Sequence, residues 1–431
     1  MGIAPCPLPS HSGSMNTQFD QSHDHYSIAR FPSSDSTSIY SQPSLPSVPS
    51  LTSQFTQSSN TTIHYQCIST LKGHSSYISS LVLAGKLLYS GSSDREIRVW
   101  SRDTLSHPIV DDHENLKPSN VVAVSSGAVK TLVVSGNKLM SGHQDHKIRV
   151  WQVVEAQFDV HHHQQQQHQR QYKRLATLPT LSDRVTKLIP SKNYVQVRRH
   201  KKSTWVHHVD AVSSLAISTD GSILYSVSWD RTLKIWRASD FKCLESINKA
   251  HDDAINAIVL SNNGLIFTGS ADKKVKVWKR IEGDKKHSLV ATLEKHESAV
   301  NALAISSDGS TLYSGACDRS IVVWAARDGC SGNGGMVVVG ALRGHTKAIL
   351  CLAVVEDLVF SGSADKSVRI WRRRVDGKYL CLGVLEGHRE AVKCLAVAAD
   401  HHNSTSSSSC FLVYSGSLDC DIRVWRISVP L

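Results

Sequence analysis

Residues 90–100 of the chain read SGSSDREIRVW, in which a serine is followed by Asp four positions later and by Trp ten positions later. The last four residues, Ile97-Arg98-Val99-Trp100, alternate between apolar and polar as in a half-buried β-strand. Gly and Asp in front of them are residues that favour a turn. The stretch therefore predicts two antiparallel strands joined by a tight turn.

The same pattern recurs six more times with the same internal spacing. The copies are SGHQDHKIRVW (141–151), SVSWDRTLKIW (226–236), TGSADKKVKVW (268–278), SGACDRSIVVW (314–324), SGSADKSVRIW (361–371) and SGSLDCDIRVW (415–425). Uninterrupted units have about the length of four short strands with their turns. Seven such units predict an all-β fold, a seven-bladed β-propeller over residues 64–431.

A second element, His-x-x-x-Val/Ile, precedes six of the seven copies, and the second unit has Ser125 where the others have His. We predict a hydrogen-bonded chain in each blade, from the Asp carboxylate through the imidazole and the Ser/Thr hydroxyl to the Trp indole. Leaving one of these buried donors without a partner would cost about 1–3 kcal/mol. The predicted structural residues are His74, Asp94, Trp100, Asp145, Trp151, His208, Asp230, Trp236, His251, Asp272, Trp278, His296, Asp318, Trp324, His345, Asp365, Trp371, His388, Asp419 and Trp425.

Ser, His and Asp also form the catalytic triads of hydrolases, but a triad is needed once and this set recurs along the chain. No glycine-rich phosphate loop or metal-ligand cluster accompanies it in the sequence. We therefore predict no catalytic residue, no cofactor and no metal site. Because the second unit lacks its His, its network is expected to be incomplete, with faster amide exchange than in blades four to six.

Ring closure can be predicted from the two ends of the repeat region. Residues 65–71, YQCISTL, have the character of a strand but belong to no unit, and only six residues follow Trp425. We expect residues 65–71 to form the outer strand of the last blade, which would remove an open sheet edge.

These repeats identify the chain as a member of the WD40 family, and residues 174–218 resemble plant WD40 proteins of the JINGUBANG type. The resemblance implies that the Asp turns and the entry loops share one face that binds partners. It points to the third and fifth residues after each His, and to the residue before each Asp. Candidate partner-binding residues at these positions are Tyr77, Lys130 and Trp229, with burial of Trp229 under a neighbouring loop as the alternative. Arg231 is a further candidate, because the residue after the Asp is basic in five blades, with a solvated turn residue as the alternative.

Three segments depart from the repeat. Residues 1–63 hold 16 Ser and 7 Pro with little apolar periodicity, so we expect a disordered tail. Residues 155–205 form a basic insert between blades two and three, with Arg198, Arg199, Lys201 and Lys202 as further candidate partner-binding residues, or simply a solvated turn. Within it, residues 174–178 suit an outer strand, and the apolar spacing at 181–189 suits a short helix ended by Pro190. Residues 400–410 are expected to form a flexible loop.

Composition and charge indicate which classes of protein are not expected. The formal net charge is +11 and the sequence pI is about 9.1, and no apolar run reaches the roughly 18 residues of a membrane-spanning helix. The excess charge forms one patch without a recognised nucleic-acid module, so direct nucleic-acid binding is not expected. Without a signal sequence, a soluble intracellular protein is expected, with Cys351 and Cys394 as reduced core residues.

These observations predict a non-enzymatic scaffold with protein partners, among them acidic or phosphorylated segments. The JINGUBANG resemblance implies a plant regulator in nucleus and cytoplasm that acts with transcription factors and restrains pollen germination. The alternative is a substrate receptor of a cullin-4 ubiquitin ligase. The signature of such receptors has Asp one position and Arg three positions after the blade Trp. Trp371-Arg372-Arg373-Arg374 keeps the Arg and lacks the Asp.

Overall fold

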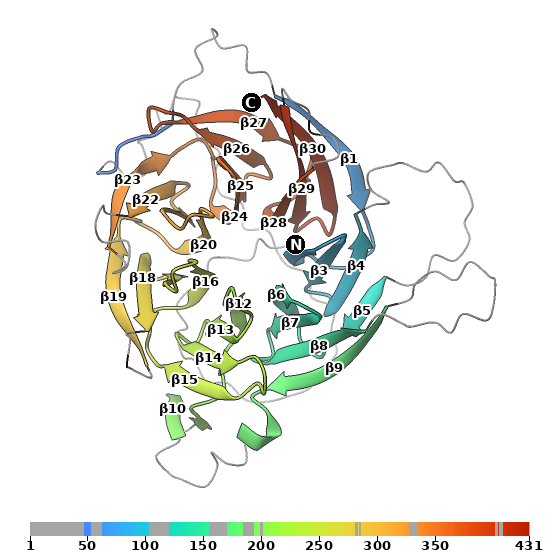
Figure 1. Cartoon of the computed structure of the whole chain (residues 1–431), viewed down its shortest axis with the longest axis vertical. Helices are drawn as coiled ribbons and strands as arrows, with labels where there is room; N and C mark the ends of the chain where they lie inside the picture. The colour runs from blue at the N-terminus through green and yellow to red at the C-terminus, as the bar shows by residue number, and fades with distance from the viewer. Residues whose placement is uncertain are drawn as a thin grey trace, which may run out of the picture.

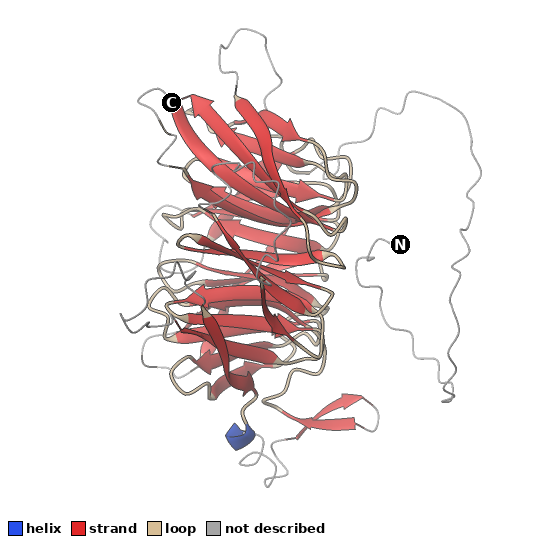
Figure 2. Cartoon of the chain, turned by 90° about the vertical axis from the view of Figure 1, so that its right-hand side faces the viewer, coloured by secondary structure: helices blue, strands red, loops and turns tan. Residues whose placement is uncertain are grey.

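The strands of the chain form seven four-stranded antiparallel sheets, arranged as blades around a central axis (Figure 1). The computed structural model describes residues 47–52, 63–102, 120–154, 170–183, 194–198, 201–280, 283, 286–326, 335–400, 404 and 408–430. Seen from the side, the sheets make a disc (Figure 2). The predicted all-β, seven-bladed propeller is confirmed.

Each blade runs from an inner strand at the axis to an outer strand at the rim. Blade 1 contains β2 (Ile78–Ala84), β3 (Leu87–Ser92), β4 (Glu96–Ser101) and β5 (Val121–Val124). Blade 2 contains β6 (Val129–Ser135), β7 (Lys138–His143), β8 (Ile148–Val154) and β9 (Gln171–Leu178). Blade 3 contains β12 (Val212–Ile217), β13 (Ile223–Ser228), β14 (Leu233–Arg237) and β15 (Cys243–Ile247).

The remaining blades follow the same plan. Blade 4 contains β16 (Ile255–Leu260), β17 (Ile266–Ser270), β18 (Lys274–Arg280) and β19 (His287–Glu294). Blade 5 contains β20 (Val300–Ile305), β21 (Thr311–Ala316), β22 (Ile321–Ala326) and β23 (Met336–Leu342). Blade 6 contains β24 (Ile349–Val355), β25 (Leu358–Ser363), β26 (Val368–Arg373) and β27 (Tyr379–Leu385). Blade 7 contains β28 (Val392–Ala399), β29 (Ser408–Ser417) and β30 (Ile422–Pro430), with β1 (His64–Leu71) as its outer strand.

The core lies between the blades, where the apolar faces of neighbouring sheets pack together. Gly91 of blade 1 shows how tight this packing is, because a Cβ there would lie 2.5 Å from Cγ1 of Val129 in blade 2. Gly416 of blade 7 makes the same kind of contact, with Ile78 of blade 1 only 2.7 Å from the Cβ position. The last blade therefore packs on the first as each blade packs on the next.

The ends of the chain close the ring as the sequence predicts. β1 pairs antiparallel with β30, from His64 opposite Ser428 to Leu71 opposite Ile422. The last blade is thus built from both ends of the repeat region, and β30 has a neighbour on each side.

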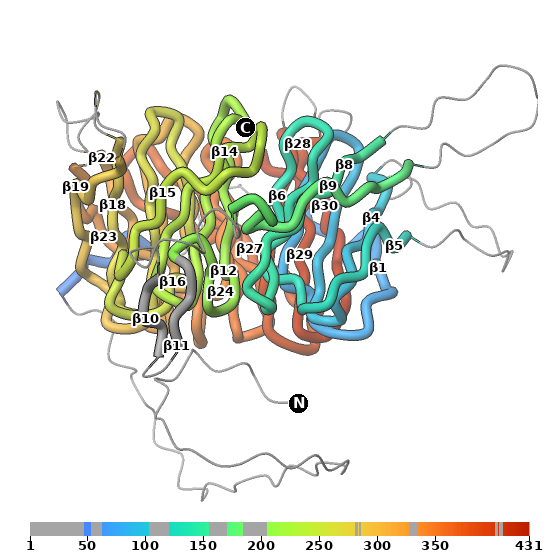
Figure 3. The backbone as a smooth tube through the Cα atoms, turned by 90° about the horizontal axis from the view of Figure 1, so that it is seen from below, coloured from blue at the N-terminus to red at the C-terminus, as the bar shows by residue number. Residues whose placement is uncertain are grey.

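The basic insert contains more regular structure than the sequence indicates. β9 begins at Gln171, three residues before the predicted strand, and residues 181–183 are helical, while residues 184–189 of the predicted helix lie outside the described part. β10 (Tyr194–Arg198) and β11 (Lys201–Thr204) form a two-stranded hairpin that was not predicted, with Arg198 opposite Lys201. This hairpin lies outside the ring of blades (Figure 1). The strands of the blades themselves run between the two faces of the disc (Figure 3).

Two expectations about irregular segments need correction. Residues 47–52 belong to the predicted tail, yet they are ordered against blades 5 and 6 through bridges from Ser50 to Ala341 and from Thr52 to Tyr379. The rest of the tail, residues 1–46 and 53–62, lies outside the described residues. The predicted loop 400–410 is shorter, because Ser408 already starts β29 and Asp400 is buried. Residues 401–403 and 405–407 lie outside the description. In the described part of the chain, no helix is long and apolar enough to cross a membrane.

Candidate functional site

The repeated polar residues form a hydrogen-bonded chain in blade 1. His74 Nδ1 donates to Asp94 Oδ2 at 2.8 Å, and His74 Nε2 lies 2.8 Å from Ser90 Oγ. The Trp100 indole donates to the same hydroxyl at 2.8 Å. Because the carboxylate accepts from Nδ1, a neutral imidazole accepts the Ser90 hydroxyl proton at Nε2, which leaves the serine oxygen free to accept from the indole.

Blades 3 to 7 repeat this chain with nearly the same geometry. The His–Asp distances are 3.2, 2.8, 2.8, 2.8 and 2.9 Å in His208–Asp230, His251–Asp272, His296–Asp318, His345–Asp365 and His388–Asp419. The indoles of Trp236, Trp278, Trp324, Trp371 and Trp425 donate to the strand hydroxyls at 2.8–2.9 Å. Every one of these Ser or Thr residues is fully buried, so its hydroxyl cannot attack an external substrate. The set holds each blade together rather than forming a catalytic centre.

In blade 2 a histidine from a different position in the sequence bonds the strand serine, so the expectation of an incomplete network is wrong. His143, two positions after Ser141 on β7, places Nε2 2.8 Å from Ser141 Oγ, and Trp151 donates to that oxygen at 3.0 Å. Its Nδ1 donates to Gly127 O at 3.1 Å. Burial lowers the pKa of His143 to about 4, so its imidazole is neutral near pH 7.

Without a histidine beside it, Asp145 is held by an arginine. Arg149 donates to both carboxylate oxygens, at 3.0 Å and 2.5 Å, and its side chain is only 5% exposed. Burial alone would raise the pKa of Asp145, but the bonds from Arg149 and Ser126 lower it well below its usual range.

This pair predicts a difference between two neighbouring blades. Arg149→Met is expected to destabilise the protein by about 3 kcal/mol, because it leaves a largely buried carboxylate without its partner. Arg98→Met at the same strand position of blade 1 is the matched control. Arg98 binds Glu96 and Asn120 while His74 holds Asp94, so we expect a loss of at most about 1 kcal/mol. Equilibrium unfolding in urea measures both, and equal losses would contradict this interpretation.

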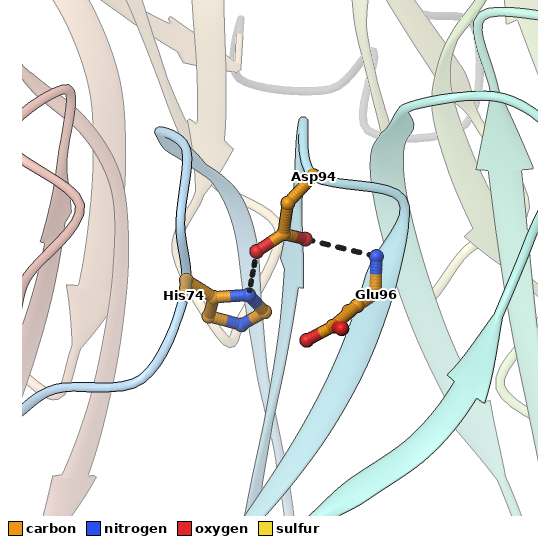
Figure 4. Close-up of side chains that lie close together, drawn as sticks. All are labelled: His74, Asp94 and Glu96. Atoms are coloured by element: carbon orange, nitrogen blue, oxygen red, sulfur yellow. Dashed lines mark hydrogen bonds and ion pairs between the residues drawn. The ribbon is translucent and has the colours of Figure 1, made fainter.

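One group of side chains has the composition of a metal site. His74, Asp94 and Glu96 have potential ligand atoms within 4.8 Å of one another (Figure 4). Both His74 nitrogens are engaged by Asp94 and Ser90, Asp94 Oδ1 accepts from the Glu96 backbone N–H, and Glu96 Oε2 accepts from Arg98. The group is therefore part of the structural network of blade 1.

Three of the candidate partner-binding residues meet near the axis, on the face that carries the Asp turns. Tyr77 precedes β2, Lys130 lies in β6, and Trp229 follows β13, so they come from blades 1, 2 and 3. The Lys130 ammonium donates to Tyr77 Oη at 3.0 Å and lies 5.3 Å from the centre of the Trp229 ring. Trp229 is half-buried, with the lysine over its ring. Together with Lys393 these residues form what we call the aromatic–lysine cluster.

Lys393 lies in β28, the inner strand of blade 7, and was not among the predicted partner-binding residues. Burial lowers the pKa of its ammonium, and the nearby Lys130 lowers it further. Burial would raise the pKa of Tyr77, but the hydrogen bond and charge of Lys130, with the charge of Lys393, lower it. Lys130 thus bonds the phenol directly, the positive charge of Lys393 also acts on it, and the repulsion between the two lysines makes this position favourable for an anionic group.

Lys393 could have been predicted from its position, because it is the fifth residue after the blade histidine, His388. In four other blades this position is polar and binds the neighbouring blade. Ser79, Ser213, Asn256 and Asn301 donate to the carbonyl oxygens of Val129, Ile255, Val300 and Ile349. Lys130 and Lys393 stand at this position and take part in the cluster instead.

The other candidates lie apart from the cluster. Arg231 is exposed, adopts a left-handed φ of 66° after Asp230, and its Nη1 lies 3.5 Å from Asp252 O. The β10–β11 hairpin at the rim contains Arg198, Lys201 and Lys202. Arg199 lies outside the described residues. The hairpin connects the end of β9 to the start of β12, which both lie at the Asp-turn face, so it leaves from the same face as Trp229.

The family model of the WD domain, G-beta repeat, matches residues 65–101, 199–237, 241–279, 287–325, 336–372 and 379–426, more than half of the chain. The chain belongs to the WD40 family. The matched segments leave out β6–β9, the blade in which His143 and Arg149 replace the usual histidine. WD40 propellers generally act as non-catalytic scaffolds that mediate protein–protein interactions.

Individual relatives of this WD40 protein match only part of its length. Protein ROOT INITIATION DEFECTIVE 3 of Arabidopsis thaliana is 30% identical over 182 residues, covering 39% of this chain and 40% of that protein. Zinc finger CCCH domain-containing protein 62 of Arabidopsis thaliana is 28% identical, covering 38% of this chain and 37% of that protein. Ribosome biogenesis protein YTM1 of Scheffersomyces stipitis is 22% identical, covering 66% and 61%. The chain thus spans less than two thirds of the length of each of these relatives.

A solved structure agrees with the fold. The WD40 β-propeller domain of Doa1 superposes with a TM-score of 0.56 at 21% identity, covering 84% of this chain and 96% of that one. At this identity the likeness concerns the architecture alone.

Proposed function

We propose that this WD40 protein is a non-enzymatic interaction scaffold that binds an acidic or phosphorylated segment of a partner protein at the aromatic–lysine cluster. The observation that carries the proposal is the position of Lys130, 5.3 Å from the centre of the Trp229 ring and 5.6 Å from that of Tyr77. An anionic side chain at the aromatic–lysine cluster would meet the Lys130 ammonium and an aromatic surface, and the charge of Lys393 would add to the attraction. Rigid aromatic side chains with a neighbouring cation are the residues that dominate binding energy at protein interfaces.

The finer role rests on resemblance. We propose a plant regulator that acts in nucleus and cytoplasm through transcription-factor or signalling partners and restrains pollen germination. Support comes from the likeness of residues 174–218 to proteins of the JINGUBANG type, and from two Arabidopsis relatives that each match more than a third of the chain.

Affinity purification from plant cells tests the cluster as the binding site. We expect Trp229→Ala and Lys130→Ala to lose the same co-purifying proteins, each by at least about tenfold, because a truncated hot spot costs about 2 kcal/mol or more. Lys366→Ala is the matched control, since Lys366 is an exposed cation after the Asp of the blade 6 turn on the same face. An unchanged partner set in the two cluster variants would refute the proposal.

The identities of the captured proteins test the finer role. Transcription factors would support the regulator, and earlier pollen germination in plants lacking the protein would agree with it. Abundant cullin-4 ligase adaptor would instead favour the receptor.

A further inference from the structure

Residues 47–52 lie along the outer rim of the propeller and form two isolated parallel β-bridges with blades that are far away in the sequence. Leu51 N–H donates to Ala341 O at 2.9 Å, and Ala341 N–H donates to Pro49 O at 2.9 Å. The segment then crosses to blade 6, where Tyr379 N–H donates to Leu51 O at 2.9 Å. It therefore pairs in parallel with the free edge of β23 and with the first residue of β27 (Figure 1).

Side chains fix the register of this segment, which we call the rim strand. Val48 is 3% exposed and joins the core cluster that contains Trp324 and Ala341. Leu51 packs on the neighbouring cluster that contains Leu342 and Tyr379. The Thr52 hydroxyl accepts from Arg343 N–H at 2.8 Å and donates to Arg343 O at 3.1 Å.

The propeller is shaped to receive this segment. A Cβ on Gly340 would lie 2.5 Å from Leu51 Cγ and 2.8 Å from Pro49 O, so a side chain at that position would exclude the rim strand. The Arg343 guanidinium also donates to Val48 O at 2.6 Å. Two apolar contacts, a set of backbone bonds and a side-chain cation thus converge on six residues.

We propose that the outer edges of β23 and β27 form a peptide-binding site for an extended Val-Pro-Ser-Leu-Thr segment, and that residues 48–52 of the same chain occupy it as an intramolecular ligand. Recognition follows strand addition to an exposed sheet edge, in which main-chain bonds supply affinity and side-chain pockets supply specificity. The site lies on the rim and is independent of the aromatic–lysine cluster. Its occupant covers an edge that would otherwise pair with other chains, and it ties the residues before it to blades 5 and 6.

The test uses a full-length variant in which residues 48–52 no longer occupy the site, and measures whether the same segment binds when it is added as a separate peptide. The opened variant is Val48→Asp with Leu51→Asp, and the probe is a fluorescent peptide of residues 44–55, SLPSVPSLTSQF. By fluorescence anisotropy we expect the opened variant to bind the peptide at least tenfold more tightly than the wild type, where the tethered segment competes at high effective concentration. The same peptide carrying Leu51→Asp should not bind. Adding Gly340→Val to the opened variant should abolish binding, while Val339→Thr at an exposed position should leave it unchanged.

Amide exchange gives a second readout that needs no peptide binding. The N–H groups of Ala341 and Tyr379, which donate to the rim strand, should exchange slowly in the wild type and at least tenfold faster in the opened variant. Fast exchange of both amides in the wild type would overturn the proposal. So would a folded opened variant that fails to bind the peptide, or that binds both peptides equally.

Discussion

Deletion of residues 64–71 is expected to lower the melting temperature of the protein by more than about 5 °C, because it removes the strand that closes the ring. β1 makes seven residue pairs with β30 and buries Leu71 in the core that joins blades 7 and 1. At about 0.5–1.5 kcal/mol for each backbone hydrogen bond, and about 2 kcal/mol for Leu71, the loss exceeds about 5 kcal/mol. The deletion also exposes the edge of β30, which then becomes able to pair with other chains.

Thermal unfolding followed by circular dichroism measures this effect, and light scattering reports the expected aggregation. Deletion of residues 161–168 is a control of the same length, placed between the end of β8 and the start of β9. We expect the control to melt within about 2 °C of the wild type, as insertions and deletions between elements cost little. A mild effect of the 64–71 deletion would refute closure by β1 as a main source of stability.

As the pH falls, the free energy of unfolding is expected to decrease in two stages, and the steeper decrease lies below pH 4. All seven turn carboxylates have lowered pKa values, about 2 for Asp94 and Asp419. Burial alone would raise these pKa values, but hydrogen bonds from the imidazoles and from backbone N–H groups outweigh it. The same combination lowers the pKa values of Asp230, Asp272, Asp318 and Asp365, whereas the bonds from Arg149 and Ser126 lower the pKa of Asp145.

The sign follows from comparing the folded and unfolded chains. An unfolded Asp titrates near pH 3.9, so between about pH 4 and pH 2 the unfolded chain binds more protons and stability falls as the pH falls. His143 adds an earlier, shallower loss between about pH 6.5 and 4, since its folded pKa is lowered to about 4. Both of these losses therefore lie below about pH 6.5.

Urea unfolding at a series of pH values checks this expectation. The slope of the unfolding free energy against pH gives the number of protons taken up, and Asp272→Asn should reduce the uptake near pH 3 by about one. Unfolding free energies that stay constant between pH 4 and pH 2.5 would contradict the role assigned to the seven carboxylates.

The repeats allowed most of the fold and all of the polar chains outside blade 2 to be predicted. Their spacing places Ser90 and Trp100 on neighbouring strands and Asp94 in the turn between them, so any hydrogen-bonded arrangement of one copy applies to the others. The polar chain of blade 2 was not predicted, because the same hydrogen bonds can be made by a histidine at a different backbone position. His143 fills from β7 the place that an entry-loop histidine fills elsewhere, and only the geometry of Ser141 and Trp151 makes the two equivalent.

The candidate site was predictable in part. Family positions selected Tyr77, Lys130 and Trp229 separately, but those positions do not tell which side chains meet, since each residue belongs to a different blade. The basic run at 198–202 has the same charge as the cluster, yet it lies in a hairpin outside the ring. The local sequence does not show how far apart the hairpin and the cluster lie in the folded protein.

By itself the sequence determined the all-β class, the number of blades and the closing strand, because these follow from the period of an alternating pattern and from strands left without a unit. Tertiary structure alone decided the contact of Lys130 with Trp229, the placing of Lys393 and the docking of residues 47–52 on blades 5 and 6. These contacts join residues from about 100 to about 330 positions apart, and they depend on how the ring brings separate blades together. Periodicity describes each blade, whereas recognition depends on the spaces between them.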